Sequence, residues 1–217
     1  MTTRRQLLKL LIRLFFWIST SLGLGFFSSS RLWAKIKKHI LPKNTDLSLL
    51  RNKNPEYLDT RNLEIMPLEA FQTMGDKDAP FEAETWRLEV TGAVQASLAL
   101  TYAEVLALPS IERKVLLVCP GVFVNHGRWK GITIKKLIER AQPSQNVSKV
   151  HIYGRSPGLG DRKETFSFDD VSSGQVFLAY SVNGQPLPRK HGFPLRVVGE
   201  GHWGSHWVKY VYKLEFK

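Results

Sequence analysis

Sulfur ligands are scarce in this chain, because only one of its 217 residues, Cys119, is a cysteine. An iron–sulfur cluster of the usual kind needs four cysteines, so the chain cannot hold one alone. A covalently attached c-type haem is also excluded, since no Cys-x-x-Cys-His sequence occurs. Any redox chemistry of this chain would therefore need a separate carrier of electrons.

Acidic residues are nearly missing from the N-terminal quarter. Residues 1–53 hold 11 of the 31 Lys and Arg and one of the 19 Asp and Glu. Most of the net charge of +12 therefore belongs to residues 1–53, and residues 54–217 are close to neutral at +2. No basic stripe interleaved with aromatic residues remains in the part expected to fold, so we expect no nucleic-acid binding.

Long hydrophobic runs are absent as well. The charge-free stretch 14–27 is shorter than the roughly 20 residues of a helical membrane span. It follows Thr-Arg-Arg-Gln-Leu-Leu-Lys at residues 3–9, which resembles a twin-arginine export signal. A surface-bound amphipathic helix is the alternative, but apolar residues cover every face of residues 14–18. We expect residues 1–30 to be an export signal, either removed or, since no Ala-x-Ala site follows, kept as a membrane anchor.

The rest of the chain divides into a short connecting segment and one domain. Residues 31–61 are basic and then polar, with little periodicity, which predicts a linker or a peripheral arm. Residues 62–217 are expected to form the folded domain. With 43% hydrophobic residues, the chain can bury one good core.

Short strands and a few helices are predicted within this domain. Thr101 and Glu104 form a capping-box pattern for a helix that ends before Pro109. Thr133 precedes apolar residues spaced i, i+3, i+4 and i+7, which predicts a second helix. Strands are predicted at 86–92, 112–119, 149–154, 175–180, 194–199 and 207–217. The expected fold class is α+β, built on a mixed β-sheet with a few short helices.

Cys119 stands where an apolar run breaks into Pro120-Gly121. This placement predicts a thiol at the end of a buried strand. A thiolate there can bind a soft metal or attack a substrate, whereas a thiol within a core only fills space.

Three later segments accompany this cysteine in a specific order. They are Asn183-Gly184-x-x-Leu187-Pro188, His191-Gly192-x-Pro194-x-Arg196, and Val208-Lys209 before the last strand, after a Trp129-x-Gly131 segment expected to open a helix. Together with Cys119 they resemble the sulfite-oxidase-type molybdopterin oxidoreductases, over residues 86–217. The likeness is closer to the exported single-domain reductases of that family than to sulfite oxidase itself.

The resemblance implies a cofactor of one molybdenum and one molybdopterin. Cys119 would be the protein's ligand to the metal and the catalytic cysteine. The residues that would bind the pterin and its phosphate are Glu69, Ala70, Gly154, His191, Arg196, Trp207, Val208 and Lys209. A guanidinium suits phosphate oxygens because it can donate two parallel hydrogen bonds.

The resemblance also implies a function, namely two-electron oxygen-atom transfer by an exported enzyme. The loop after Cys119 holds no arginine before Arg128, so an uncharged substrate such as a sulfoxide is expected unless Arg155 or Arg162 folds back. His126, His202 and His206 are expected to line the mouth of the site. The expected partners are the twin-arginine export machinery and an electron carrier, either a membrane haem protein or a cytochrome. The expected location is periplasmic or otherwise extracytoplasmic.

Two other functions are compatible with the same residues. Cys119 could be a nucleophile with His126, seven residues away, as its base. The chain could also be a binding domain that keeps the fold and holds no metal. Stoichiometric molybdenum and a pterin chromophore in the purified chain would exclude both.

Overall fold

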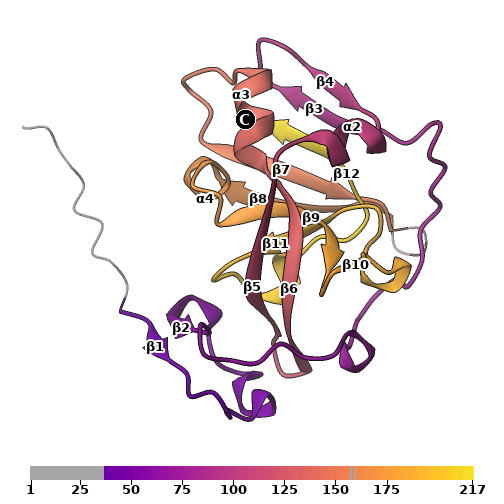
Figure 1. Ribbon diagram of the computed structural model, residues 1–217. Coiled ribbons are helices and arrows are strands. Elements are labelled where there is room, and N and C mark those ends of the chain that lie inside the picture. The colour runs from indigo at the N-terminus through magenta and orange to yellow at the C-terminus, as the bar shows by residue number, and fades with distance from the viewer. Residues whose placement is uncertain (1–36, 157, 159) are drawn as a thin grey trace, which may run out of the picture. The chain divides into compact units, whose positions relative to one another are not determined.

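The computed structural model describes residues 37–156, 158 and 160–217 (Figure 1). The expected export signal or anchor at residues 1–30 lies outside these residues. The described residues belong to one compact unit. Within the described ranges, no helix is both long and apolar enough to cross a membrane.

The first of two five-stranded sheets is mixed. Its strand order is β4-β3-β12-β7-β8, and only β12 and β3 run parallel. The strands are β3 (Leu88–Gly92), β4 (Leu98–Leu100), β7 (Lys149–Gly154), β8 (Arg162–Ser167) and β12 (Val211–Phe216).

The second sheet is antiparallel and carries the cysteine. Its order is β10-β9-β6-β5, with β11 also paired to β9. The long hairpin of β5 and β6 runs down the middle of Figure 1. The strands are β5 (Ser110–Cys119), β6 (Phe123–Thr133), β9 (Val176–Val182), β10 (Gln185–Pro186) and β11 (Arg196–Gly199).

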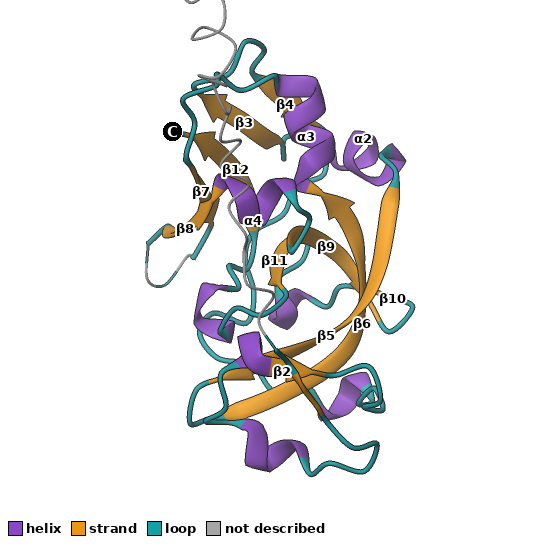
Figure 2. Cartoon of the chain, turned by 90° about the vertical axis from the view of Figure 1, so that its left-hand side faces the viewer, coloured by secondary structure: helices purple, strands orange, loops and turns teal. Residues whose placement is uncertain are grey.

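Three α-helices are present in the described part of the chain. They are α2 (Tyr102–Ala107), α3 (Ile134–Ala141) and α4 (Phe168–Ser172). The predicted capping box of Thr101 and Glu104 is confirmed, with both reciprocal hydrogen bonds formed. Figure 2 shows α3 and α4 between the two sheets, where α3 contacts β6 and β9 and α4 contacts β7, β8 and β9. Both sheets therefore share one main core with these helices.

Residues 37–61 form an arm packed against the β5–β6 hairpin. The arm contains β1 (His39–Ile40) and β2 (Leu58–Asp59), which pair in parallel, and the 3₁₀ helices Leu47–Leu50 and Pro55–Tyr57. Its Leu41 and Leu50 are buried in one cluster with Leu116, Val118 and Val124. Further 3₁₀ turns are Leu68–Ala70, Arg189–His191 and Gly204–His206.

The expected α+β class with a mixed sheet is confirmed, and most predicted elements are present. Seven elements were not predicted, namely β1, β2, β4, β6, β8, β10 and α4. The expectation that Trp129-x-Gly131 opens a helix is wrong, because both residues lie within β6 and α3 begins only at Ile134. The last strand begins at Val211 instead of Trp207, because Tyr210 has φ = 56° and the pairing with β7 shifts after Val211.

Candidate functional site

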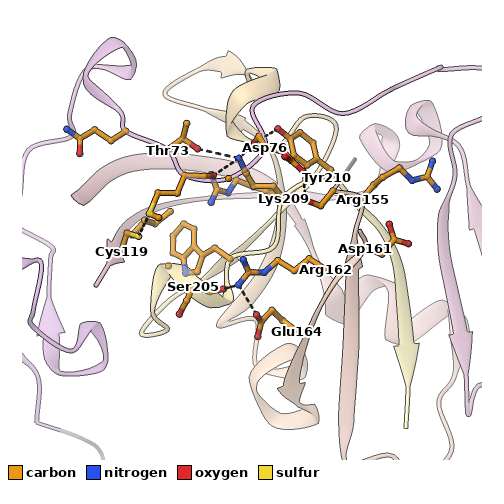
Figure 3. Close-up of a pocket in the computed structure, with 18 of the residues that line it drawn as sticks. Thr73, Asp76, Cys119, Arg155, Asp161, Arg162, Glu164, Ser205, Lys209 and Tyr210 are labelled. Atoms are coloured by element: carbon orange, nitrogen blue, oxygen red, sulfur yellow. Dashed lines mark hydrogen bonds and ion pairs between the residues drawn. The ribbon is translucent and has the colours of Figure 1, made fainter. Parts of the chain in front are cut away.

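A cavity of about 650 Å³ opens where both sheets meet the segment 72–76. Figure 3 shows its walls, with Cys119 at one side and Arg155 and Asp161 at the other. Its volume lies within the range of sites that enclose cofactors and drug-sized ligands. The lining residues are Gln72, Thr73, Met74, Gly75, Asp76, Leu117, Cys119, Phe123, Arg155, Ser156, Gly160, Asp161, Arg162, Glu164, Arg196, Gly204, Ser205, Trp207, Lys209 and Tyr210.

Cys119 is the last residue of β5, at the strand end that the sequence predicts. It pairs with Phe123, and the two-residue alternation of the strand puts Leu117 on the same, cavity-facing side. The Cys119 Sγ lies 3.5 Å from the Met74 Sδ. Burial raises the pKa of the thiol. The thiol therefore needs a metal, or another external charge, to become a thiolate near neutral pH.

Arg196 is the most deeply buried cation of the site. It begins β11, is 4% exposed and faces the rings of Trp129 and Trp207 at 5.0 and 5.5 Å. Its Nη1 donates to the His191 carbonyl at 3.0 Å, while its buried Nε has no acceptor. Burial lowers its pKa to about 9. No carboxylate of the described residues pairs with it, so an anion in the cavity would complete its bonding.

Lys209 brings a second cation to the same cavity. Its Nζ donates to the carbonyls of Met74 at 3.0 Å, Lys190 at 3.2 Å, and Asp76. Burial, and then the nearby charge of Arg196, lower the pKa of Lys209 to about 8. Tyr210, the next residue, donates its hydroxyl to the same Asp76 carbonyl at 2.8 Å. Lys209 thus holds the segment 73–76 at the cavity.

His191 lies behind the cavity wall. It is 1% exposed, and its Nε2 is buried without a hydrogen-bond partner. Burial, with the charges of Arg196, Lys190 and Lys209, lowers its pKa to about 4. The ring is therefore neutral near pH 7.

The structure brings together four of the nine sequence-predicted site residues. Cys119, Arg196, Trp207 and Lys209 all line the cavity. Val208 and Gly154 are buried beside it, and a Cβ on Gly154 would lie 2.1 Å from the Lys209 carbonyl. Gly154 therefore allows β7 to approach the Lys209 backbone closely.

Two predicted pterin contacts lie outside the cavity wall. Glu69 and Ala70 are in an exposed 3₁₀ turn and are absent from the lining. The lining begins just after them, at Gln72. The nearby residue that does reach the core is Phe71, whose ring lies 5.9 Å from both Trp129 and His191.

The histidines expected at the mouth are placed elsewhere. His126 is fully buried, and its Nδ1 lies 2.8 Å from the Glu64 carbonyl. It pairs with Leu116, whose side of the hairpin faces away from Cys119. His202 and His206 face Asp170 and Glu164 and do not line the cavity. Cys119 therefore has no histidine base beside it, which removes the geometric support for a thiol nucleophile activated by His126.

The sequence left open whether Arg155 or Arg162 folds back to the site, and both line the cavity. Arg162 donates to Glu164 at 2.9 Å and to the Ser205 carbonyl. Arg155 lies over the Tyr212 ring at 5.0 Å, and its side chain points away from Cys119 in Figure 3. The residues that sequence reasoning missed are Met74, Asp76, Asp161, Glu164 and Tyr210. No spacing rule marks them, because Glu164 lies in β8, which was not predicted, and the other four lie in irregular segments.

A family model described as the oxidoreductase molybdopterin binding domain matches residues 76–217. The chain belongs to this family. The family expected from the sequence is therefore confirmed, together with an oxidoreductase class that uses molybdenum bound to molybdopterin.

Curated relatives of this molybdopterin-binding chain include several oxidoreductases. Human mitochondrial sulfite oxidase is 29% identical over 191 residues, covering 72% of this chain and 34% of that protein. The protein-methionine-sulfoxide reductase catalytic subunit MsrP of Gluconobacter oxydans is 24% identical over 160 residues, covering 65% of this chain and 51% of that protein. The chain thus spans between a third and a half of these relatives.

A solved structure shares the fold. The sulfane dehydrogenase SoxCD from Paracoccus pantotrophus superposes with a TM-score of 0.59 at 18% identity, covering 83% of this chain and 50% of that chain. This likeness concerns the fold alone.

The residues of the cavity fit a molybdopterin. The thiol of Cys119 is a soft ligand suited to a metal. The buried, unpartnered Arg196 Nε and His191 Nε2 are polar atoms that an anionic, hydrogen-bonding ligand could satisfy. No group of three or more His, Cys, Asp or Glu able to hold a metal occurs in residues 37–156, 158 and 160–217. The remaining metal ligands would then come from the cofactor.

Proposed function

We propose that this chain transfers an oxygen atom in a two-electron reaction to or from an uncharged substrate such as a sulfoxide. The observation that carries the proposal is one cavity that joins the thiol of Cys119 to the buried cation of Arg196. A metal ligand and an anion-binding group would thus serve one cofactor. When bound, that cofactor supplies the two-electron redox chemistry and the site of oxygen exchange.

The chain's own residues would bind and orient the cofactor. Cys119 would ligate the metal as a thiolate, since coordination removes the thiol proton. Arg196 would form two parallel hydrogen bonds to a phosphate, and Lys209 would add a second charge. The neutral His191 would offer one directed hydrogen bond. The pterin roles of Glu69 and Ala70 would have to use backbone groups, because their side chains lie away from the cavity.

The walls around Cys119 support an uncharged substrate. Leu117, Phe123 and Met74 surround this side of the cavity. Arg162 is paired with Glu164, and the Arg155 side chain points away from Cys119. A relative named as a methionine-sulfoxide reductase catalytic subunit agrees with this substrate class.

Electron exchange would require a separate partner, because one cysteine and no haem-attachment motif leave the chain without a second redox centre of those kinds. A membrane haem protein or a cytochrome would fit. The twin-arginine pattern supports export to the periplasm, with residues 1–30 either removed or kept as an anchor.

The proposed function is tested by measuring the metal content of the chain together with its turnover of a sulfoxide. The full chain from a host that makes molybdopterin should contain about one molybdenum and one pterin, and should reduce dimethyl sulfoxide with a reduced dye as electron donor. Cys119→Ser should abolish turnover and keep the fold, whereas Val122→Ala, an exposed neighbour outside the cavity, should keep both. A metal-free wild-type chain would support the binding-domain alternative, and a metal-free chain that loses an activity in Cys119→Ser would support the thiol enzyme.

A further inference from the structure

Met74 is an exposed apolar side chain that lies against the chain's single thiol. Its Sδ is 3.5 Å from the Cys119 Sγ, although 55% of the residue is exposed. Among the large apolar residues exposed in the described part of the chain, it alone lines the cavity. A molecule that enters the cavity on this side therefore meets an apolar side chain.

The backbone on both sides of Met74 is fixed by hydrogen bonds. Gln72 exchanges two of them with the buried side chain of Asn125, at 2.8 and 3.0 Å. Lys209 binds the carbonyl of Met74 itself at 3.0 Å. Tyr210 donates to the carbonyl of Asp76 at 2.8 Å. The backbone that carries the thioether is therefore fixed on both sides by hydrogen bonds.

The surroundings divide the cavity into two ends of different chemistry. Beside Cys119 the cavity is lined by Met74, Leu117 and Phe123, with the Lys209 ammonium on the Met74 carbonyl. Arg155 and Asp161 lie at the opposite side (Figure 3). A thioether is polarizable and has no N–H or O–H donor, so it can contact carbon and sulfur groups but cannot bind an oxyanion. A reagent approaching the Cys119 sulfur meets this side chain.

We propose that Met74 is a specificity-determining residue that covers Cys119 and admits uncharged groups to it in preference to oxyanions. The substrate class rests on the proposed function. That Met74 covers the Cys119 thiol does not depend on the proposed function. It follows from the contact between the two sulfur atoms and from the hydrogen bonds that fix the segment 72–76.

Alkylation of the full chain, prepared without cofactor, tests the covering directly. Cys119 is the only cysteine, so the label reports one residue. We expect Met74→Ala to speed iodoacetamide labelling at least fivefold, Met74→Leu to stay within twofold of wild type, and Val122→Ala to match wild type. Rates measured across pH separate a change of thiol pKa from a change of access. A Met74→Ala rate within twofold of wild type would overturn the proposal.

The charge preference is tested with a matched pair of reagents. Iodoacetamide is neutral and iodoacetate is its anionic counterpart. The ratio of the neutral to the anionic rate should fall at least threefold in Met74→Gln, which keeps the side-chain length and adds amide donors. An unchanged ratio would overturn the selection. In the loaded enzyme, Met74→Gln should raise the KM for dimethyl sulfoxide severalfold, with kcat within about twofold. A wild type that reduces no sulfoxide would refute the proposed function, while the alkylation ratios would still decide the role of Met74.

Discussion

At Arg196 the needs of the folded chain and of the cofactor oppose each other. The guanidinium is buried without a carboxylate, and burial lowers its pKa to about 9. A buried cation without its counterion destabilises the fold, but it is ready to bind an anion.

Replacing Arg196 should therefore change stability and cofactor content in opposite directions. We expect Arg196→Met to raise the free energy of unfolding of the cofactor-free chain by about 1 kcal/mol, because apolar replacement of buried charge is often stabilising. Cofactor binding should weaken by about 2–5 kcal/mol, since a phosphate loses its charged donor. Calorimetry and molybdenum per chain measure the two effects. Full molybdenum content would contradict the assignment, and Arg128→Ala at the surface is the control.

Lys209 gives the site a pH dependence. Its pKa is about 8, lowered by burial and by Arg196, while Asp76 raises it and Arg162 lowers it further. Lys209 is thus charged below pH 8 and loses its proton as the pH rises, so its help to a bound anion is present below pH 8 and lost above it. In the cofactor-free chain the unfolding free energy should rise between pH 8 and the usual lysine pKa, where the unfolded chain binds more protons.

Sulfate offers a probe of that charge, because its own charge is constant over this range. Thermal protection of the cofactor-free chain by sulfate should be larger at pH 7 than at pH 9.5. The difference should shrink in Lys209→Met. Equal protection at both pH values in the wild type would mean that Lys209 does not bind the anion.

At the scale of the elements, the sequence predicted well those strands and helices that show a regular apolar pattern or a capping residue. β3 and β7 bury alternate residues, and α2 and α3 have a capping box or one buried face. β5 was predicted from the continuous apolar run that ends at Cys119. β6 was not predicted from the sequence. Both of its faces are covered, and polar residues such as those it buries are typical of a loop. Its buried Asn125 and His126 bind backbone groups 53 and 62 residues away, at Gln72 and Glu64, and such distant partners leave no local pattern.

The site residues also divide into those that the sequence predicts and those that it does not. Cys119 and Arg196 could be predicted, since one ends an apolar strand and the other belongs to a recognisable motif. Met74 and Asp76 could not, because their importance comes from contacts of an irregular segment with Cys119 and Tyr210.

Gly131 explains part of the Trp129-x-Gly131 pattern. A Cβ at this position would lie 1.9 Å from the Leu178 carbonyl of β9, where the β6–β9 register shifts. We expect Gly131→Ala to lower the free energy of unfolding by more than about 2 kcal/mol, as strand separation or strain is unavoidable. Denaturant unfolding measures it. Gly158→Ala, which meets only the Asp76 carboxylate at 3.1 Å, should change stability much less, and equal effects would contradict this explanation.

At the scale of the whole molecule, the expected export depends on residues 1–30, which lie outside the described part of the chain. Replacing Arg4 and Arg5 by Lys should keep the protein in the cytoplasm with its cofactor loaded, because the signal is read by a receptor and takes no part in the cavity. Fractionation and molybdenum content measure the outcome. Unchanged export of the double variant would indicate another route.

The hydrogen bonds and packing that hold the segment around Met74 bear on where the functional domain begins. The family match starts at Asp76, yet Met74, the Gln72 backbone and the packed ring of Phe71 all precede it. A chain shortened to residues 76–217 would keep every motif of the family and lose the wall beside its own cysteine. It would also uncover Leu116 and Val118, which the arm buries. In this protein the boundary of the recognisable family and the boundary of the functional unit are different places.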